Sequence, residues 1–291
     1  MTLLNIYDKH YKKLLIIPFA LLVLSLVVIG AQIAKTGDFV NKGVSIKGGL
    51  TLTIPEKTTD TLELQNQIKS NFPDADVTVR DLRVAGQKSG LIIDASDISS
   101  VDLLNEVKSN IGELNKDEYT LEEIGSALGD AFFKQTLIAV VIAFLFMAGV
   151  VFLYFRSIVP SFAIILAAAS DMIITLAIFN LLGHKLSTAG IAAFLMLIGY
   201  SVDSNILLST KVWKGTGGTV LERIVSASKT GLMMLSTTII ALIVALVFTQ
   251  SEVLKQIMII LLIGLFVDLI NTWIQNAGIL RYYLEKKQSE A

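Results

Sequence analysis

The sequence predicts a polytopic α-helical membrane protein with six transmembrane helices and an α+β domain between the first and second helices. Of its 291 residues, 53% are hydrophobic and only 17% are charged, and the mean hydropathy is +0.68, which is unusual for a soluble domain. The apolar residues are also concentrated in six stretches of about 20 residues, the length that crosses a bilayer as a helix. These stretches cover residues 14–34, 137–155, 158–182, 188–210, 231–249 and 256–280.

The stretch at 14–34 is interpreted as an uncleaved anchor, because its apolar run is longer than the core of a signal peptide and a poor cleavage site follows it. Lysine and arginine are concentrated before the first stretch, in alternate short loops and after the last stretch. By the positive-inside rule, both termini are cytoplasmic. The expected organisation is a cytoplasmic N-terminus and first helix (1–34), an extracytoplasmic domain (35–130), and five helices with a cytoplasmic C-terminus (131–291).

The extracytoplasmic segment alternates between the period of a strand and the period of a helix. Its order, β-α-β-β-α-β, predicts a ferredoxin-like domain. No catalytic constellation is present in it, and Asp94 and Asp97 are expected to be turn and cap residues. The predicted elements are a strand at 50–54, a helix at 58–72, a hairpin formed by 77–84 and 91–93 with a turn containing Gly86, a helix at 99–111 and a short strand at 119–121.

The composition argues against several classes of function. The net charge is −1 and the basic residues are scattered, which argues against a nucleic-acid partner. With no cysteine and only His10 and His184, the chain lacks the residues for thiolate or histidine metal sites. No G-x-x-x-x-G-K-[ST] motif occurs. We therefore expect no enzymatic activity, no cofactor and no metal.

Three aspartates lie within the predicted transmembrane helices: Asp171 in the third, Asp203 in the fourth and Asp268 in the sixth. A carboxylate at mid-membrane costs about 2.5–3.5 kcal/mol, so three of them in one bundle predict a function. Counted from the assumed helix ends, Asp203 and Asp268 lie roughly 10 Å nearer the cytoplasm than Asp171, forming a staggered ladder that could carry protons. The alternative is that each aspartate, protonated, donates a hydrogen bond that holds two helices together.

Polar and small residues share helical faces with these acids and predict a common polar interior. Gly264, Asn271, Thr272 and Gln275 form one stripe with Asp268. Lys211 ends the fourth helix and could approach an acid, although lysine at a helix end usually extends to the lipid headgroups. The residues expected to line the interior are Thr175, Gly199, Ser201, Asn205, Asn271 and Gln275.

Four motifs resemble the SecD/SecF family of Sec translocase subunits in the resistance-nodulation-division superfamily, which also has the layout of one helix, a small outer domain and five helices. Residues 155–157 with Asp171 resemble the third-helix signature of SecF, and residues 198–203 (IGYSVD) its fourth-helix signature. Residues 267–273 (VDLINTW) resemble the archaeal form of the sixth helix. The fourth motif, GVSIKGG, resembles the glycine-glycine motif after the first helix and contains Gly43, Gly48 and Gly49.

The resemblance, which favours an archaeal SecF, implies an accessory subunit of protein export that uses the proton motive force. Its implied partners are SecD, a SecY-type translocon channel, the exported polypeptide and membrane lipid. Asp171, Asp203, Asp268 and Lys211 are the candidates for proton coupling. Position 203 is usually an amide in bacterial SecF, Lys211 stands where bacterial SecF has an arginine, and Ser45 replaces an acid of the glycine-glycine motif.

Two other functions stay open at this point. One is a small-molecule proton antiporter of the same superfamily, although such chains usually have twelve transmembrane helices and two large outer loops. The other is a scaffold subunit without proton coupling, against which the three intramembrane acids argue.

Overall fold

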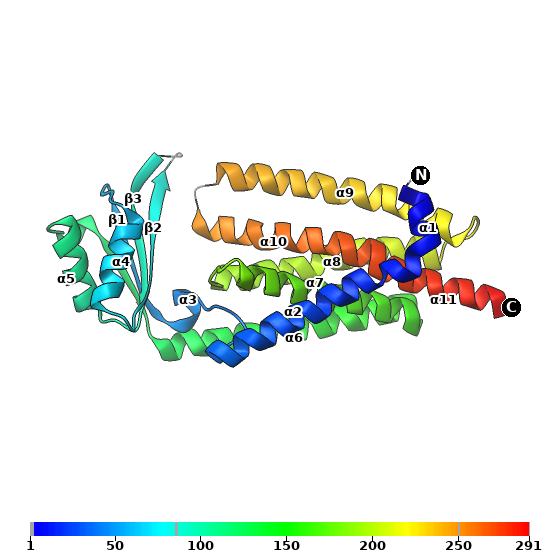
Figure 1. The fold of residues 1–291 in the computed structure, drawn as a ribbon, viewed down its shortest axis with the longest axis horizontal. Helices are drawn as coiled ribbons and strands as arrows, with labels where there is room; N and C mark the ends of the chain where they lie inside the picture. Colours follow the sequence, from blue (N-terminus) through cyan, green and yellow to red (C-terminus); the bar gives the residue numbers. More distant parts are fainter. Residues whose placement is uncertain (1–2, 85–86, 250, 291) are drawn as a thin grey trace.

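The structure of the chain is a computed structural model that describes residues 3–84, 87–249 and 251–290. Within this part, six helices are long and apolar enough to cross a membrane, as the sequence predicts. They form a bundle with both chain termini at one end and the sheet domain at the other (Figure 1). The helices are α1 (Leu3–Leu14) with α2 (Ile16–Thr36), α6 (Ser126–Phe155), α7 (Ile158–Leu181), α8 (Thr188–Trp213), α9 (Val220–Phe248), and α10 (Glu252–Ile270), which continues through the π-helical turn η2 (Asn271–Asn276) into α11 (Ala277–Glu290).

Several helices extend beyond the apolar stretches that predict them. Helix α6 begins at Ser126, well ahead of the apolar stretch at 137–155, α9 begins at Val220, ahead of 231–249, and the sixth helix continues to Glu290. The added turns carry polar residues, which a hydropathy pattern does not count. At the start of α9, Thr219 and Glu222 form a reciprocal capping box that fixes the helix end.

The segment between α2 and α6 contains the predicted order of strands and helices. Its described strands form one antiparallel sheet in the order β2-β3-β1-β4. Asp60 caps the helix at Thr61–Asn71, and Ser99 caps the helix at Ser100–Ile111. The predicted hairpin turn at Gly86 lies outside the described residues. The elements are α3 (Val44–Lys47), β1 (Gly49–Pro55), α4 (Thr61–Asn71), β2 (Asp76–Val84), β3 (Gln87–Ser96), α5 (Ser100–Ile111), η1 (Lys116–Glu118) and β4 (Thr120–Ile124).

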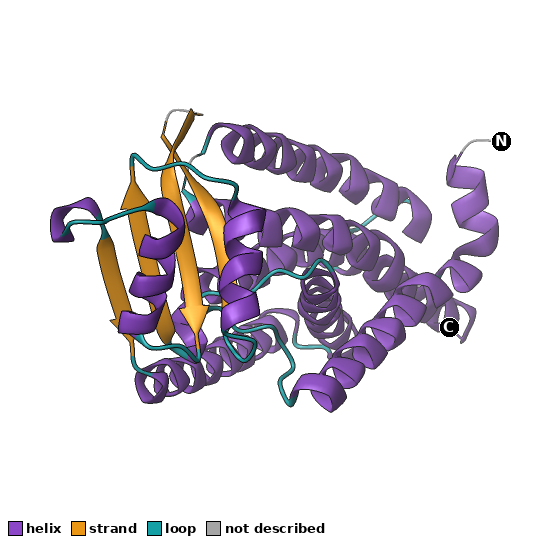
Figure 2. Ribbon diagram, turned by 60° about the vertical axis from the view of Figure 1, so that its left-hand side comes forward, coloured by secondary structure: helices purple, strands orange, loops and turns teal. Residues whose placement is uncertain are grey.

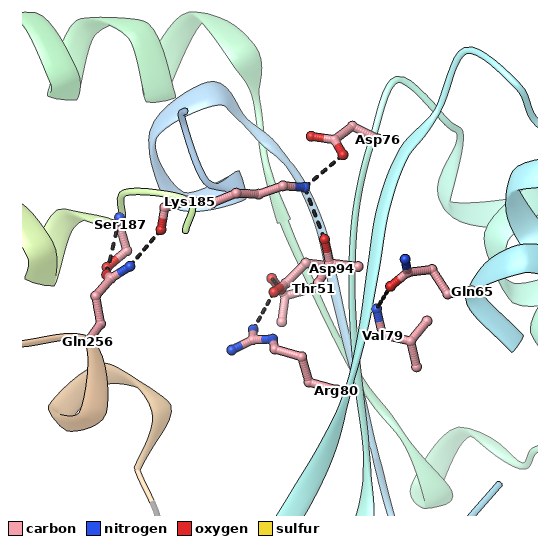
Figure 3. A network of polar contacts seen from close by, with 10 residues as sticks. Thr51, Gln65, Asp76, Val79, Arg80, Asp94, Lys185, Ser187 and Gln256 are labelled. Carbon is pink, nitrogen blue, oxygen red and sulfur yellow. Dashed lines mark hydrogen bonds and ion pairs between the residues drawn. The ribbon is translucent and has the colours of Figure 1, made fainter. Parts of the chain in front are cut away.

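The sheet has one apolar face and one polar face. Leu50, Leu52 and Ile54 alternate along β1 and are buried with residues of α4 and α5, which cover that face (Figure 2). The other face is turned toward the bundle and carries polar side chains, among them Thr51 and Asp94 (Figure 3).

The prediction for Asp94 as a turn or cap residue is wrong. It lies within β3, where it accepts a hydrogen bond from Thr51 at 2.9 Å and pairs with Arg80. Cross-strand pairing explains the acid there, because Asp94 lies opposite Thr51 on β1. Asp97 does lie in the turn after β3, and the hydrogen bond from Lys47 lowers the pKa of its carboxyl group.

We expect residues 35–130 to fold without the membrane helices. The domain encloses its own apolar core, which is formed by both helices and the sheet. The isolated fragment should be soluble, show a circular-dichroism spectrum of mixed α and β structure, and unfold cooperatively. A random-coil spectrum would contradict this expectation.

The sheet domain contacts the bundle at its base, at the backbone of the loop that leads into α8, and along β2. At the base of the domain, α3 packs on α6, and a Cβ added to Gly129 of α6 would lie 2.6 Å from the carbonyl oxygen of Ile46. Further along the sheet, Lys185 in the loop between α7 and α8 donates to Asp76 at 2.7 Å and to Thr78 at 3.0 Å on β2 (Figure 3). The amide of Gln256 in α10 donates to the carbonyl of Lys185 at 2.6 Å. The domain is therefore connected to the first turns of α8 and α10.

Candidate functional site in the membrane helices

Asp171 and Asp268 lie in the centre of the bundle, where α7, α8 and α10 pack against one another. Their side chains are 0% and 1% exposed. Asp171 accepts a hydrogen bond from the Ser201 hydroxyl at 2.5 Å and another from the Asn271 amide at 2.7 Å. One carboxyl group therefore links all three helices.

Asp268 has a separate set of donors on α8 and η2. Its carboxyl group accepts from Ser204 at 2.8 Å and from Thr272 at 2.7 Å, and the Asn205 amide lies 3.4 Å away. The same Asn205 amide donates to the Ser201 carbonyl at 2.7 Å, next to Asp171. The two acids therefore share one network. The predicted stagger of about 10 Å between Asp171 and Asp268 is wrong, because one short stretch of α8, from Ser201 to Asn205, supplies donors to both carboxyl groups.

The network continues along α8 and η2 toward the chain termini. Asn276 donates to the Asn205 side chain at 2.6 Å and approaches the Ser209 hydroxyl at 3.3 Å. Gln275 approaches Ser170 on α7 at 3.4 Å. The π-helical turn η2 contributes most of the polar side chains on this side of the network. Four of its six residues are polar and fully buried: Asn271, Thr272, Gln275 and Asn276.

Small residues let the three helices approach closely. A Cβ added to Gly264 of α10 would lie 2.3 Å from Leu197 of α8, and Ala167 and Ala168 of α7 are fully buried. Backbones held this close bring short side chains such as serine and asparagine within hydrogen-bonding distance.

The described residues place no lysine or arginine against either carboxyl group. Lys211 instead donates to Thr230 at 2.9 Å and to the Ser226 carbonyl at 3.2 Å, both on α9. Lys211 therefore does not approach either acid in this structure. Nor does any group of three or more His, Cys, Asp or Glu in the described chain suit a metal ion.

The expectation that Asp203 and Gly199 line the interior is wrong for this chain. Both are exposed on the outward face of α8, whereas Ser201 and Asn205 are buried. At about 100° per residue, positions two apart point about 200° apart, so the two pairs cannot share a face. The other predicted lining residues, Thr175 on α7 and Asn271 and Gln275 on η2, are buried.

Four members of the network were missing from the predicted lining and stripe: Ser170, Ser204, Ser209 and Asn276. Ser209 was detectable, because it follows Asn205 by one helical turn on the same face. Asn276 was detectable on the same ground, because it follows Thr272 of the predicted stripe by four residues.

Comparison with known proteins gives consistent matches over almost the whole chain. A family model described as "Protein export membrane protein SecD/SecF, C-terminal" matches residues 104–286. The chain is 39% identical over 280 residues to the protein-export membrane protein SecF of Pyrococcus furiosus, covering 96% of this chain and 93% of that protein. It is 38% identical over 290 residues to SecF of Methanocaldococcus jannaschii, covering 97% and 99%.

Among solved structures, the crystal structure of SecDF from Thermus thermophilus, described as a translocon-associated membrane protein, resembles this fold with a TM-score of 0.73 at 20% identity. That match covers 98% of this chain and 40% of the SecDF chain. A SecDF structure in a super-membrane-facing form has a TM-score of 0.58, also at 20% identity. At this identity, the likeness concerns the fold.

Proposed function

The chain belongs to the SecD/SecF family of protein-export membrane proteins, and on this basis we propose that it is an accessory subunit of Sec-dependent export that couples proton movement to the transport of polypeptides. Its partner in this proposal is SecD, and the pair acts beside a SecY-type channel on an exported polypeptide. The observation that carries the proton-coupling role is the buried pair Asp171 and Asp268, joined by one hydrogen-bond network.

Burial without a cation makes the two acids suited to proton transfer. Two ionised carboxyl groups side by side in a low-dielectric interior repel each other, and each loses its hydration. Since no described lysine or arginine lies against either carboxyl group, a proton bound by the pair would lower this repulsion. A change in the packing of α7, α8 and α10 would alter the donors around each acid, and so bind or release a proton.

The proposed topology has both termini in the cytoplasm and the domain at 35–130 on the opposite side of the membrane. Its support is the position of both termini at one end of the bundle, together with the basic residues there, including Lys9, Lys12 and Lys13 (Figure 1). We further propose that the domain is ferredoxin-like, for which the element order and the sheet order β2-β3-β1-β4 provide the support.

The contacts with the sheet domain suggest how proton binding would become movement. The donors to both acids are on α8 and on η2, which continues α10. The first turns of α8 and α10 lie beside the Lys185 loop that contacts β2 (Figure 3). A shift of either helix therefore displaces the sheet domain. In this proposal, the displaced domain acts on the emerging polypeptide.

The outward face of α8 supports the proposed association with SecD. Asp203 is an exposed acid within a transmembrane helix, which is costly against lipid. One turn before it, Gly199 leaves open space into which another helix fits. A partner helix packed on this face would cover both positions, giving Asp203 a role in coupling at the subunit contact. Lys211 is hydrogen-bonded to α9, so it is the candidate for proton coupling that the structure supports least.

Co-purification tests this proposal. When the chain is isolated from native membranes in mild detergent, we expect SecD to accompany it as a stable complex, because the exposed acid needs a protein partner. Replacing Gly199 with tryptophan should reduce the amount of SecD recovered, whereas the same change at Gly149, in open space on α6, serves as the matched control. A stable monomer from cells that contain SecD would count against the proposed association.

A further inference from the structure

A cavity lies between α6, α7 and α8, in the half of the bundle next to the sheet domain. Its volume is about 170 Å³, which is large for a protein interior, where voids wider than a water molecule are few. Its wall includes Met172 and Leu176 of α7, which lie roughly 8–14 Å from the end of that helix at Leu181. At this depth, the surroundings of the bundle are the hydrocarbon core of the bilayer.

The side chains that line the cavity are all apolar. An apolar cavity of this kind stays dry, and it has no hydrogen-bonding group that could hold a polar ligand. A dry cavity of about 150 Å³ in a soluble protein accepts a molecule of the size of benzene, which indicates a capacity of about six carbon atoms here. The cavity is therefore suited to hydrocarbon.

The cavity is closed on the side of α8 and opens between α6 and α7. Ile191 and Phe194 of α8, which form its floor, are only 5% and 7% exposed. Leu137 of α6 is 37% exposed, and Met172 and Ile173 of α7 are half-buried, so the mouth is on this side. Helix α6 runs along the edge of the bundle opposite α9, and most of its side chains are exposed (Figure 1). Lipid is therefore the medium outside the mouth.

Two lysines lie at the sheet-domain end of this mouth. Nζ of Lys42 is 5.0 Å from the centre of the Phe133 ring, which lines the cavity. Lys42 also forms an ion pair with Asp38 at 2.8 Å. Lys134 follows Phe133 in α6 and is exposed, at the level where the apolar stretch of this helix begins. A lipid phosphate at the membrane surface would therefore meet positive charge beside the mouth.

We propose that this cavity is a lipid site, which takes up about six carbons of one alkyl chain of a phospholipid while the phosphate group lies beside Lys42 and Lys134. The bound chain fills the space between α6 and α7 and so holds α6 in place. Because α3 packs on α6 at the base of the sheet domain, the lipid supports the connection between the domain and the bundle. The site is separate from the acid pair and does not depend on the proposed function in export.

Photo-crosslinking in vesicles tests this proposal. The complex with SecD would be reconstituted in phosphatidylglycerol vesicles with a small fraction of the same phospholipid carrying a diazirine in one alkyl chain. Irradiation joins this chain to the residues that it contacts, and mass spectrometry of peptides identifies them. We expect adducts on Ile191 and Phe194, which are buried and meet lipid only through the cavity. Adducts on the exposed Val141 of α6 without adducts on Ile191 and Phe194 would overturn the proposal.

Filling the cavity provides a second measurement. Val140→Trp puts a larger side chain into the cavity and should remove most of the adducts on Ile191 and Phe194. The matched control is Val141→Trp, at the neighbouring exposed position, which should leave these adducts unchanged. Leu176→Trp fills the same space from α7, so the comparison remains possible if one variant folds poorly. Equal yields of these adducts in the filled variants and the control would contradict the proposal.

The role of the phosphate group is tested with a second lipid. Lys134→Gln should lower the yield of cavity adducts from the photoreactive phospholipid, but not from a diacylglycerol that carries the same diazirine chain. An equal change with both lipids would contradict the predicted contact with phosphate.

The other apolar ligand that could enter the cavity is a segment of an exported polypeptide. An excess of an apolar signal peptide should leave the lipid adducts on Ile191 and Phe194 unchanged. If the peptide removed these adducts, and a photoreactive form of it labelled the same two residues, the cavity would belong to the polypeptide and the lipid proposal would be wrong.

Discussion

Asp171→Asn is expected to remove most export that depends on the proton motive force, while membrane levels and association with SecD stay close to normal. Asparagine has the shape of aspartate but cannot release a proton at physiological pH. The structure can accommodate the new amide, because the Asn271 side chain has an unpaired oxygen that would accept a hydrogen bond after the amide rotates. The defect would therefore be one of proton transfer rather than of folding.

The measurement is the rate at which a secreted reporter is processed with and without an uncoupler. Asp268→Asn should resemble Asp171→Asn, because both acids belong to one network. Asp203→Asn should be milder, since its side chain lies on the outward face, and Lys211→Ala should be the mildest. Unchanged uncoupler-sensitive export in the Asp171→Asn, Asp203→Asn double variant would favour the scaffold function instead.

Gly48→Ala is expected to separate the sheet domain from the bundle and abolish export. Gly48 has φ of 86° and ψ of 161°, a conformation that is essentially restricted to glycine and costs other residues about 1–3 kcal/mol. An added Cβ would also lie 2.5 Å from the Cα of Ser126, at the start of α6. Strain and collision act at the same point, where the domain meets its supporting helix.

Gly112→Ala is the matched control for this prediction. Gly112 also has a positive φ, of 91°, but an added Cβ meets nothing within 4 Å. The control therefore carries the strain without the collision, and should retain export. Limited proteolysis of the purified complex measures the effect directly, with the 35–130 domain released from Gly48→Ala much faster than from Gly112→Ala. Equal release from the two variants would show that the close approach to α6 has no role.

The sequence was sufficient to predict the sheet domain because its elements have clear periods and caps. Strands with alternating apolar residues, such as 50–54, and helices capped by Asp60 and Ser99 lie within a few residues of their predicted positions. The members of the predicted stripe, Asp268 with Gly264, Asn271, Thr272 and Gln275, are all buried, and the last three of them lie in the π-helical turn.

Two features of the candidate site could not be predicted from the sequence pattern. The pairing of Asp171 with Asp268 depends on the relative height of α7 and α10, which apolar stretches with uncertain ends do not determine. The π-helical turn depends on a local change of hydrogen bonding that leaves no hydropathy pattern. The outward position of Asp203, in contrast, could have been deduced by comparing its helical phase with that of Ser201.

Proton uptake into liposomes tests the central claim most directly. The chain would be reconstituted with SecD in vesicles that contain a pH-sensitive dye, and a pH gradient would be imposed across the membrane. We expect a proton flux above that of empty liposomes, reduced to the background level by Asp171→Asn and retained in Gly112→Ala. A flux that is the same with aspartate or asparagine at position 171 would contradict a proton-carrying role for the buried acids.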